Sequence, residues 1–123
     1  MAITKHDIFE NSDGRCYYCG VLVGENWHAE HLQPKSQGGK YNKENIVVSC
    51  QICNLRKHCN TVEEFRLILK MRVLRELRRN LEVYKKLILP YIKKTDQEEI
   101  EIIFDSLSEK IAKTKIVFWG EKN

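Results

Sequence analysis

The second half of the chain has the periodicity of long amphipathic helices. A capping box at Thr61–Glu64 predicts a helix start, and apolar residues then recur at helical spacing from Phe65 to Ile88. Pro90 is expected to end this helix. A second capping box at Thr95–Glu98 predicts a further helix, with an apolar stripe from Ile100 to Ile111. The face of the first helix opposite its stripe is basic and carries Arg72, Arg75, Arg79 and Lys86.

The first half of the chain predicts shorter elements. Residues 4–11 have the pattern of a short helix with a threonine cap. Residues 26–32 (NWHAEHL) alternate as a strand does, and residues 33–44 (QPKSQGGKYNKE) are typical of a loop. Residues 45–50 (NIVVSC) predict a second strand, and a helix is expected to begin at the second cysteine pair, within residues 50–59.

Length and composition limit the class of protein. The 123 residues are enough for one domain, or for one domain with an appendage. Hydrophobic residues make up 42% and charged residues 31% of the chain, which is typical of a globular protein. Because no apolar run has the length of a signal peptide or of a membrane span, we expect a cytoplasmic protein without a membrane partner.

Positive charge is concentrated in the middle of the chain. Residues 54–94 carry twelve basic and four acidic side chains, a net of +8, whereas residues 1–53 carry −1 and residues 95–123 carry −3. Such a block favours a polyanionic partner, because each phosphate that a basic side chain neutralises releases condensed counterions. A solvated helix surface would show the same bias, so the charge alone leaves both interpretations open.

Two Cys-x-x-Cys pairs indicate a metal site. Cys16 and Cys19 form the first pair, and Cys50 and Cys53 form the second. Zn²⁺ takes four soft ligands in a tetrahedron, and each pair supplies two of them. In a reducing compartment such pairs hold a metal more often than a disulfide. The sequence therefore predicts a structural zinc site with all four cysteines as ligands, while Cys59 is left as a free thiol without a role.

The segment between and around the cysteine pairs resembles the zinc-stapled branch of the HNH endonuclease family. The resemblance covers about residues 14–60 and leaves residues 61–123 uncovered. The matching elements, in chain order, are Cys16–Cys19, Glu30-His31-Leu32-Gln33-Pro34, Gly38-Gly39, Asn45-Ile46, and Cys50–Cys53 followed by Asn54 and Lys57. The resemblance implies an α+β fold: a small ββα-metal (His-Me finger) module with a four-cysteine zinc site, followed here by a helical C-terminal extension.

The resemblance also implies roles for individual residues. His31 would be the general base, because a neutral imidazole can accept a proton near neutral pH. Glu30 and Asn54 would hold a catalytic Mg²⁺ or Mn²⁺, cations that accept oxygen ligands and keep open positions for phosphate. Asn45 would bridge the loop backbone and orient His31. Arg56 and Lys57 would contact phosphate. Outside the resemblance, the basic row of Arg72, Arg75, Arg79 and Lys86 would lie along the DNA backbone if the extension packs on the module.

Three histidine and carboxylate positions leave alternatives open. Glu30 stands where the family usually has aspartate, and its extra methylene could alter metal preference or slow the reaction. His28 shares a strand face with Glu30 and could take part, or could be a surface residue. His58 lies four residues after Asn54, so on a helix both would point the same way. His58 is therefore either a further metal ligand or a solvent-facing histidine.

The sequence predicts an HNH nuclease module over residues 1–60 and a helical extension over residues 61–123. The extension could pack on the module, form a homodimer that places two active sites on opposite strands, or bind a protein partner through residues 95–109. The favoured function is a metal-dependent endonuclease acting on duplex or branched DNA, with no small-molecule cofactor. A zinc-containing nucleic-acid-binding module without catalysis is the main alternative, and a zinc-supported interaction protein is the third.

Overall fold

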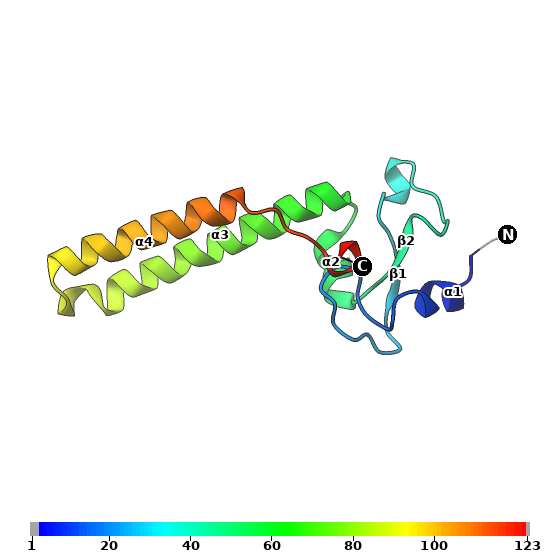
Figure 1. Ribbon diagram of the computed structural model, residues 1–123, viewed down its shortest axis with the longest axis horizontal. Helices are drawn as coiled ribbons and strands as arrows, with labels where there is room; N and C mark the ends of the chain where they lie inside the picture. Colours follow the sequence, from blue (N-terminus) through cyan, green and yellow to red (C-terminus); the bar gives the residue numbers. More distant parts are fainter. Residues whose placement is uncertain (1–2, 123) are drawn as a thin grey trace. The chain divides into compact units, whose positions relative to one another are not determined.

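The computed structural model describes residues 3–122, and the chain divides into two compact units (Figure 1). The first unit runs up to Phe65 and includes the residues from Val117 onward, and the second comprises residues 66–116. The predicted division into a nuclease module over residues 1–60 and an extension over residues 61–123 stays a prediction; by its contacts, the first unit also includes residues 61–65 and 117–122. No helix within residues 3–122 combines the length and the apolarity that a membrane crossing requires.

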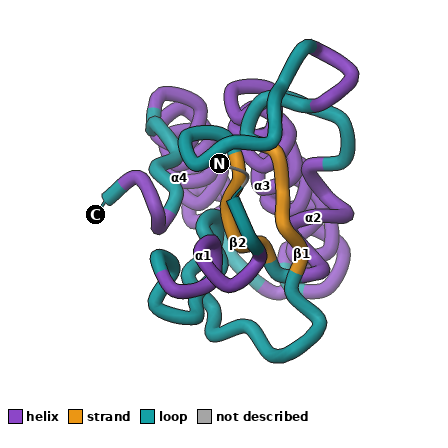
Figure 2. Tube along the Cα trace, turned by 90° about the vertical axis from the view of Figure 1, so that its right-hand side faces the viewer, coloured by secondary structure: helices purple, strands orange, loops and turns teal. Residues whose placement is uncertain are grey.

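The first unit is built on a two-stranded antiparallel sheet (Figure 2). Strand β1 is His28–His31 and strand β2 is Ile46–Ser49; His28 pairs with Ser49 and His31 with Ile46. The elements around them are helix α1 (Lys5–Glu10), the 3₁₀ turn η1 (Lys35–Gln37) and helix α2 (Gln51–Lys57). Helix α1 packs on β2, and α2 packs on β1. The predicted α+β ββα arrangement is confirmed.

Two apolar clusters hold the first unit together. Ile8 of α1 is buried against Ile46 and Val48 of β2, because the capping box of Thr4 and Asp7 starts α1 where this face meets the sheet. A second cluster is aromatic: Phe65 and Phe118 stack with centroids 5.3 Å apart, and Tyr18 meets both rings edge-on. Phe118 precedes the 3₁₀ turn η3 (Trp119–Glu121), so the end of the chain is part of this unit.

The second unit, hereafter the hairpin, consists of two antiparallel helices. Helix α3 is Val62–Leu87, the 3₁₀ turn η2 is Leu89–Tyr91, and helix α4 is Lys94–Lys113. Lys70 Nζ donates to the carbonyl of Ala112 at 3.1 Å, and Lys85 pairs with Glu101 at 3.2 Å. These two contacts fix the register of the helices along the hairpin.

The helix starts in this half of the chain test the predicted caps. The capping box of Thr61 and Glu64 is confirmed, with backbone-to-side-chain hydrogen bonds of 2.9 and 3.2 Å in the two directions. The box predicted at Thr95–Glu98 is wrong, because α4 already begins at Lys94. Gln97 fixes the turn instead, since its amide donates to the carbonyls of Leu89 and Ile92 at 2.8 and 3.1 Å.

Candidate functional site

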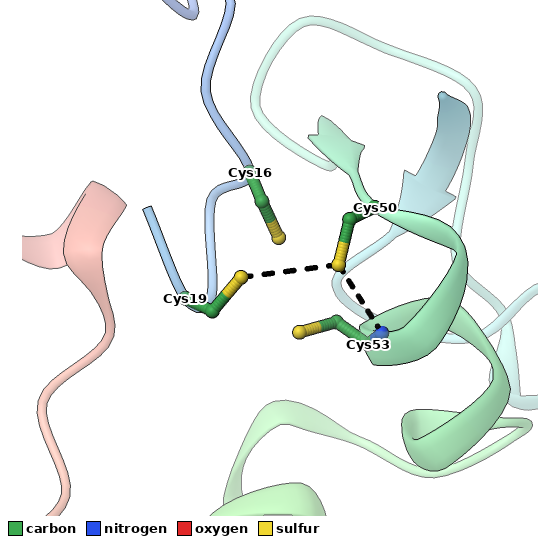
Figure 3. A group of neighbouring side chains, drawn as sticks. All are labelled: Cys16, Cys19, Cys50 and Cys53. Carbon is green, nitrogen blue, oxygen red and sulfur yellow. Dashed lines mark hydrogen bonds between the residues drawn. The ribbon is translucent and has the colours of Figure 1, made fainter. Parts of the chain in front are cut away.

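The four paired cysteines converge on one point (Figure 3). The Sγ atoms of Cys16, Cys19, Cys50 and Cys53 all lie within 4.8 Å of one another, and those of Cys19 and Cys50 are 3.8 Å apart. A tetrahedral zinc with Zn–S bonds of about 2.3 Å requires sulfur atoms about 3.8 Å apart. The cluster therefore fits structural Zn²⁺. Cys59 is exposed and lies outside it.

Local backbone geometry builds each corner of the cluster. The first pair lies in a tight turn in which Gly20 adopts φ 77° and its amide donates to the carbonyl of Cys16 at 2.9 Å. The second pair forms the start of α2, where Cys50 is the N-cap and its Sγ accepts from the amide of Cys53 at 3.4 Å. Each pair thus points two sulfur atoms inward without distorting the strand or helix next to it.

Contacts between the thiols shift their pKa values. The thiol of Cys53 donates to Cys16, which lowers the pKa of Cys16 to about 4 and raises the pKa of Cys53. Burial raises the pKa of Cys19. The lowered pKa favours the thiolate of Cys16, the form in which a cysteine binds a metal ion.

A second group of functional side chains surrounds a surface hollow of about 340 Å³. Four of the predicted site residues line it: Glu30, His31, Asn54 and His58. Pro34, Lys35 and Ser36 of the loop and Cys59 complete much of its wall. His28 lies at the exposed start of β1 and is not among the residues that line the hollow. The structure therefore brings the family-implied base and its candidate metal ligands together, and leaves His28 apart.

The loop after β1 is held in place by Asn45. Its side-chain oxygen accepts from the amide of Gln33 at 2.8 Å, and its amide donates to the carbonyls of Gln33 and Lys40 at 3.1 and 2.9 Å. These are the loop-bridging bonds expected of this asparagine; its role in orienting His31 stays a prediction. Gly39 passes so close to the carbonyl of Gln33 that a Cβ would lie 1.8 Å from it, so the loop requires glycine there.

Glu30 lies at the floor of the hollow in a buried network. Its Oε1 accepts from Nζ of Lys57 at 2.9 Å, and its Oε2 accepts from the hydroxyl of Tyr18. Glu30 is 6% exposed and Lys57 is 0% exposed. Burial, followed by the nearby charge of Glu30, raises the pKa of Tyr18, so the phenol stays protonated and donates. Both carboxylate oxygens of Glu30 thus already have a donor.

Lys57 has a different place from the one predicted. Besides Glu30, its Nζ contacts the backbone carbonyl of His31 at 2.8 Å, which ties α2 to the end of β1. With no exposed surface, Lys57 cannot meet a phosphate in this arrangement. Arg56, its neighbour, is exposed, as are Arg72, Arg75, Arg79 and Lys86 on α3. A DNA contact by these five residues stays a prediction.

The network also contains a functional residue that sequence reasoning missed. Tyr18 stands between the cysteines of the first pair, whose spacing points only to the two sulfur ligands. The available signal was Glu30: a carboxylate at an inward-facing strand position requires buried donors. The donors come from residues 12 positions before it and 27 positions after it, so no local pattern identifies them.

His58 differs from the helical position expected of it. Helix α2 ends at Lys57, and His58 is its C-cap residue, with φ 52° and ψ −129°. Its amide still donates to the carbonyl of Asn54 at 3.0 Å, but a positive φ is strained for a residue with a side chain. The strain is compatible with function, because the turn presents the imidazole at the hollow beside Asn54.

The donor set around the hollow suits a hard divalent cation in its chemistry. A carboxylate oxygen of Glu30, the amide oxygen of Asn54 and the imidazole of His58 are available types of ligand for Mg²⁺ or Mn²⁺. They are less closely assembled than the cysteines. Within residues 3–122, the cysteine cluster is the only set of three or more His, Cys, Asp or Glu ligand atoms close enough to share an ion.

The fold and the site together define a small ββα module with a four-cysteine cluster able to hold a metal, and with a histidine and an asparagine at a surface hollow. The model of the HNH endonuclease family matches residues 16–60, so the resemblance seen in the sequence is confirmed for this segment. The match includes all four cysteines and every residue that lines the hollow. No curated protein and no solved structure shows significant similarity to the chain.

Proposed function

We propose that this protein is a metal-dependent DNA endonuclease whose active site is the hollow between β1, the following loop and α2. The observation that carries the proposal is the convergence of His31, Asn54 and His58 on one hollow inside the HNH segment. The exposed basic row of α3 supports a polyanionic substrate.

In this mechanism His31 accepts the proton of the water that attacks the phosphorus, while the 3′ oxygen of the scissile bond leaves. The ring lies at the end of β1 with an edge toward Tyr41, at a centroid distance of 5.9 Å, and it is partly exposed to the hollow. Lys57 and Asn45 position His31 by fixing the strand end and the loop on its two sides. Asn54, His58 and Glu30 would hold a Mg²⁺ or Mn²⁺ ion, which when bound supplies positive charge to the phosphate.

One observation favours a second candidate, a nucleic-acid-binding module without catalysis. Both oxygens of Glu30 accept hydrogen bonds, one of them from a lysine, so the carboxylate carries less free negative charge than a dedicated metal ligand. Each oxygen has a second lone pair, however, and the ion could use it. The nuclease is favoured because a binding module would give no role to His31.

We expect the zinc-loaded protein to relax or linearise supercoiled plasmid with Mg²⁺ or Mn²⁺, and the product to fall at least about a hundredfold in the variant His31→Ala. The reason is that the variant keeps the hollow and loses the base. The measurement is the initial rate of conversion on agarose gels, with His28→Ala as the matched control, because His28 begins the same strand outside the hollow.

Three results would contradict this prediction. Equal rates for the native protein and His31→Ala would remove His31 from the chemistry. The absence of product with either metal, together with a gel shift that weakens as salt rises, would favour the binding module. A protein with neither cleavage nor salt-dependent DNA binding would support the third hypothesis, an interaction protein in which zinc only stabilises a docking surface.

A further inference from the structure

The hairpin leaves much of its apolar surface without cover. Of residues 66–116, all of which the structure describes, only Arg66 is buried. Two helices meet along a single seam, here marked by the rings of Tyr84 and Phe104 with centroids 6.4 Å apart. A seam of this kind cannot shield the apolar residues on its flanks, and helical bundles commonly solve this problem with a second pair of helices.

One flank of the hairpin carries a strip of five residues without charge. Val73, Asn80 and Leu87 recur every seven residues on α3, and Ile103 and Leu107 are four residues apart on α4. Relative to the seam, helical geometry places these residues on the side away from Lys85 and Glu101. Because the ion pair of Lys85 and Glu101 marks one flank of the hairpin, the strip of five residues occupies the other. All five are exposed.

The strip is symmetric about its centre. Val73 and Leu87 lie seven residues before and after Asn80. The contacts of Lys70 with Ala112 and of Lys85 with Glu101 place Asn80 level with Asp105, midway between Ile103 and Leu107. A two-fold axis at this level would bring Val73 against the partner's Leu87 and Ile103 against the partner's Leu107. Asn80 would face the partner's Asn80, and an asparagine amide can both donate to and accept from its own copy.

Charge favours this strip over the outer face of α3 as a contact between copies. The outer face of α3, opposite the seam, is strongly basic and would repel itself; it carries Arg72, Arg75, Arg79 and Lys86. The five residues of the strip have no charge; Glu76 borders the strip on α3, and Glu99 and Lys110 border it on α4. The same two-fold axis places Glu99 beside the partner's Lys110, so the edge of the contact is complementary as well.

We propose that the strip is a homodimer interface, in which the hairpins of two copies form an antiparallel four-helix bundle with Asn80 at the two-fold axis. The proposal does not depend on the nuclease assignment, because the strip lies wholly within residues 66–116.

The test is the oligomeric state of the zinc-loaded full chain, measured by sedimentation equilibrium. We expect a dimer, and we expect Val73→Glu to raise its dissociation constant about a hundredfold or more, because two-fold symmetry buries the new charge twice. Met71→Glu is the matched control: Met71 lies away from the strip, beside Arg75 and Arg78 of the same helix, and is 52% exposed, against 47% for Val73. This control should remain a dimer. Circular dichroism checks that both variants stay helical.

A charge exchange tests the proposed register independently of the apolar strip. Lys110→Glu alone should weaken the dimer about tenfold, because Glu99 would then face a like charge across the axis. The double variant Glu99→Lys with Lys110→Glu should restore the native dissociation constant. A monomeric native chain, or a dimer that Val73→Glu and Met71→Glu weaken equally, would overturn the interface. A dimer that survives Lys110→Glu unchanged would overturn the register.

Discussion

Removal of zinc is expected to unfold the first unit. Its two apolar clusters are small, and two of the four sulfur ligands, Cys16 and Cys53, are buried. Zinc bound by the four cysteines would join the turn before β1 to the start of α2, and structural zinc sites contribute about 10–16 kcal/mol of binding free energy that is available to folding. Substitution Cys53→Ala should therefore abolish stoichiometric zinc and native structure together, as a strong chelator should in the unaltered chain.

Tryptophan fluorescence reports this unfolding selectively. Both tryptophans belong to the first unit: the ring of Trp27 lies 5.7 Å from that of Phe9, and the amide of Trp119 donates to the carbonyl of Tyr18 at 3.1 Å. The measurement is the emission spectrum together with the zinc content per chain. Cys59→Ala is the control, because Cys59 is exposed and outside the cluster. If Cys53→Ala keeps one zinc and a native spectrum, the proposed ligand set is incorrect.

The parts of the fold that depend on short stretches of sequence were predictable. Both strands, α1, α2, and the capping box of Thr61 and Glu64 follow from alternation, caps and turn residues. The zinc cluster was predictable too, because each Cys-x-x-Cys pair fixes its own geometry and only the meeting of the two pairs is long-range. The hollow followed from the family motif, whose residues fall on adjacent ends of β1 and α2.

The rest depended on contacts between distant residues. Phe118 completes the aromatic cluster with Tyr18 and Phe65, and the sequence around residue 118 does not predict these contacts. The start of α4 depended on the side-chain amide of Gln97, which donates hydrogen bonds to two backbone carbonyls of the preceding turn. Lys57 is a basic residue shortly after the second cysteine pair, where a phosphate ligand was expected. Only the tertiary structure shows that its ammonium group is enclosed.

Lys57→Met is expected to destabilise the zinc-loaded protein by about 3–5 kcal/mol, the cost of leaving a buried charge without its partner. Glu30 is 6% exposed, and in this variant its carboxylate would keep only the hydroxyl of Tyr18 as a donor. The bond from Lys57 to the carbonyl of His31 would also be lost. The measurement is urea unfolding followed by tryptophan fluorescence at fixed zinc.

Arg56→Met is the matched control, because Arg56 precedes Lys57 on the same helix and is exposed. It should change the free energy of unfolding by less than about 0.5 kcal/mol, as surface substitutions usually do. The double variant Glu30→Gln with Lys57→Met should recover part of the stability lost in Lys57→Met, because it removes the unpaired charge.

The variants Lys57→Met and Arg56→Met also separate the two roles considered for Lys57, a phosphate ligand and a buried positioning residue. A phosphate ligand would leave stability unchanged on substitution, lower DNA affinity for all sequences and reduce the dependence of binding on salt. Substitution of a buried positioning residue would lower the free energy of unfolding and would slow cleavage, because His31 would be held less firmly. The salt dependence of DNA binding would stay that of the native protein. The structure favours the second pattern for Lys57 and the first for Arg56, since the ammonium group already has two partners inside the protein and the guanidinium group faces solvent.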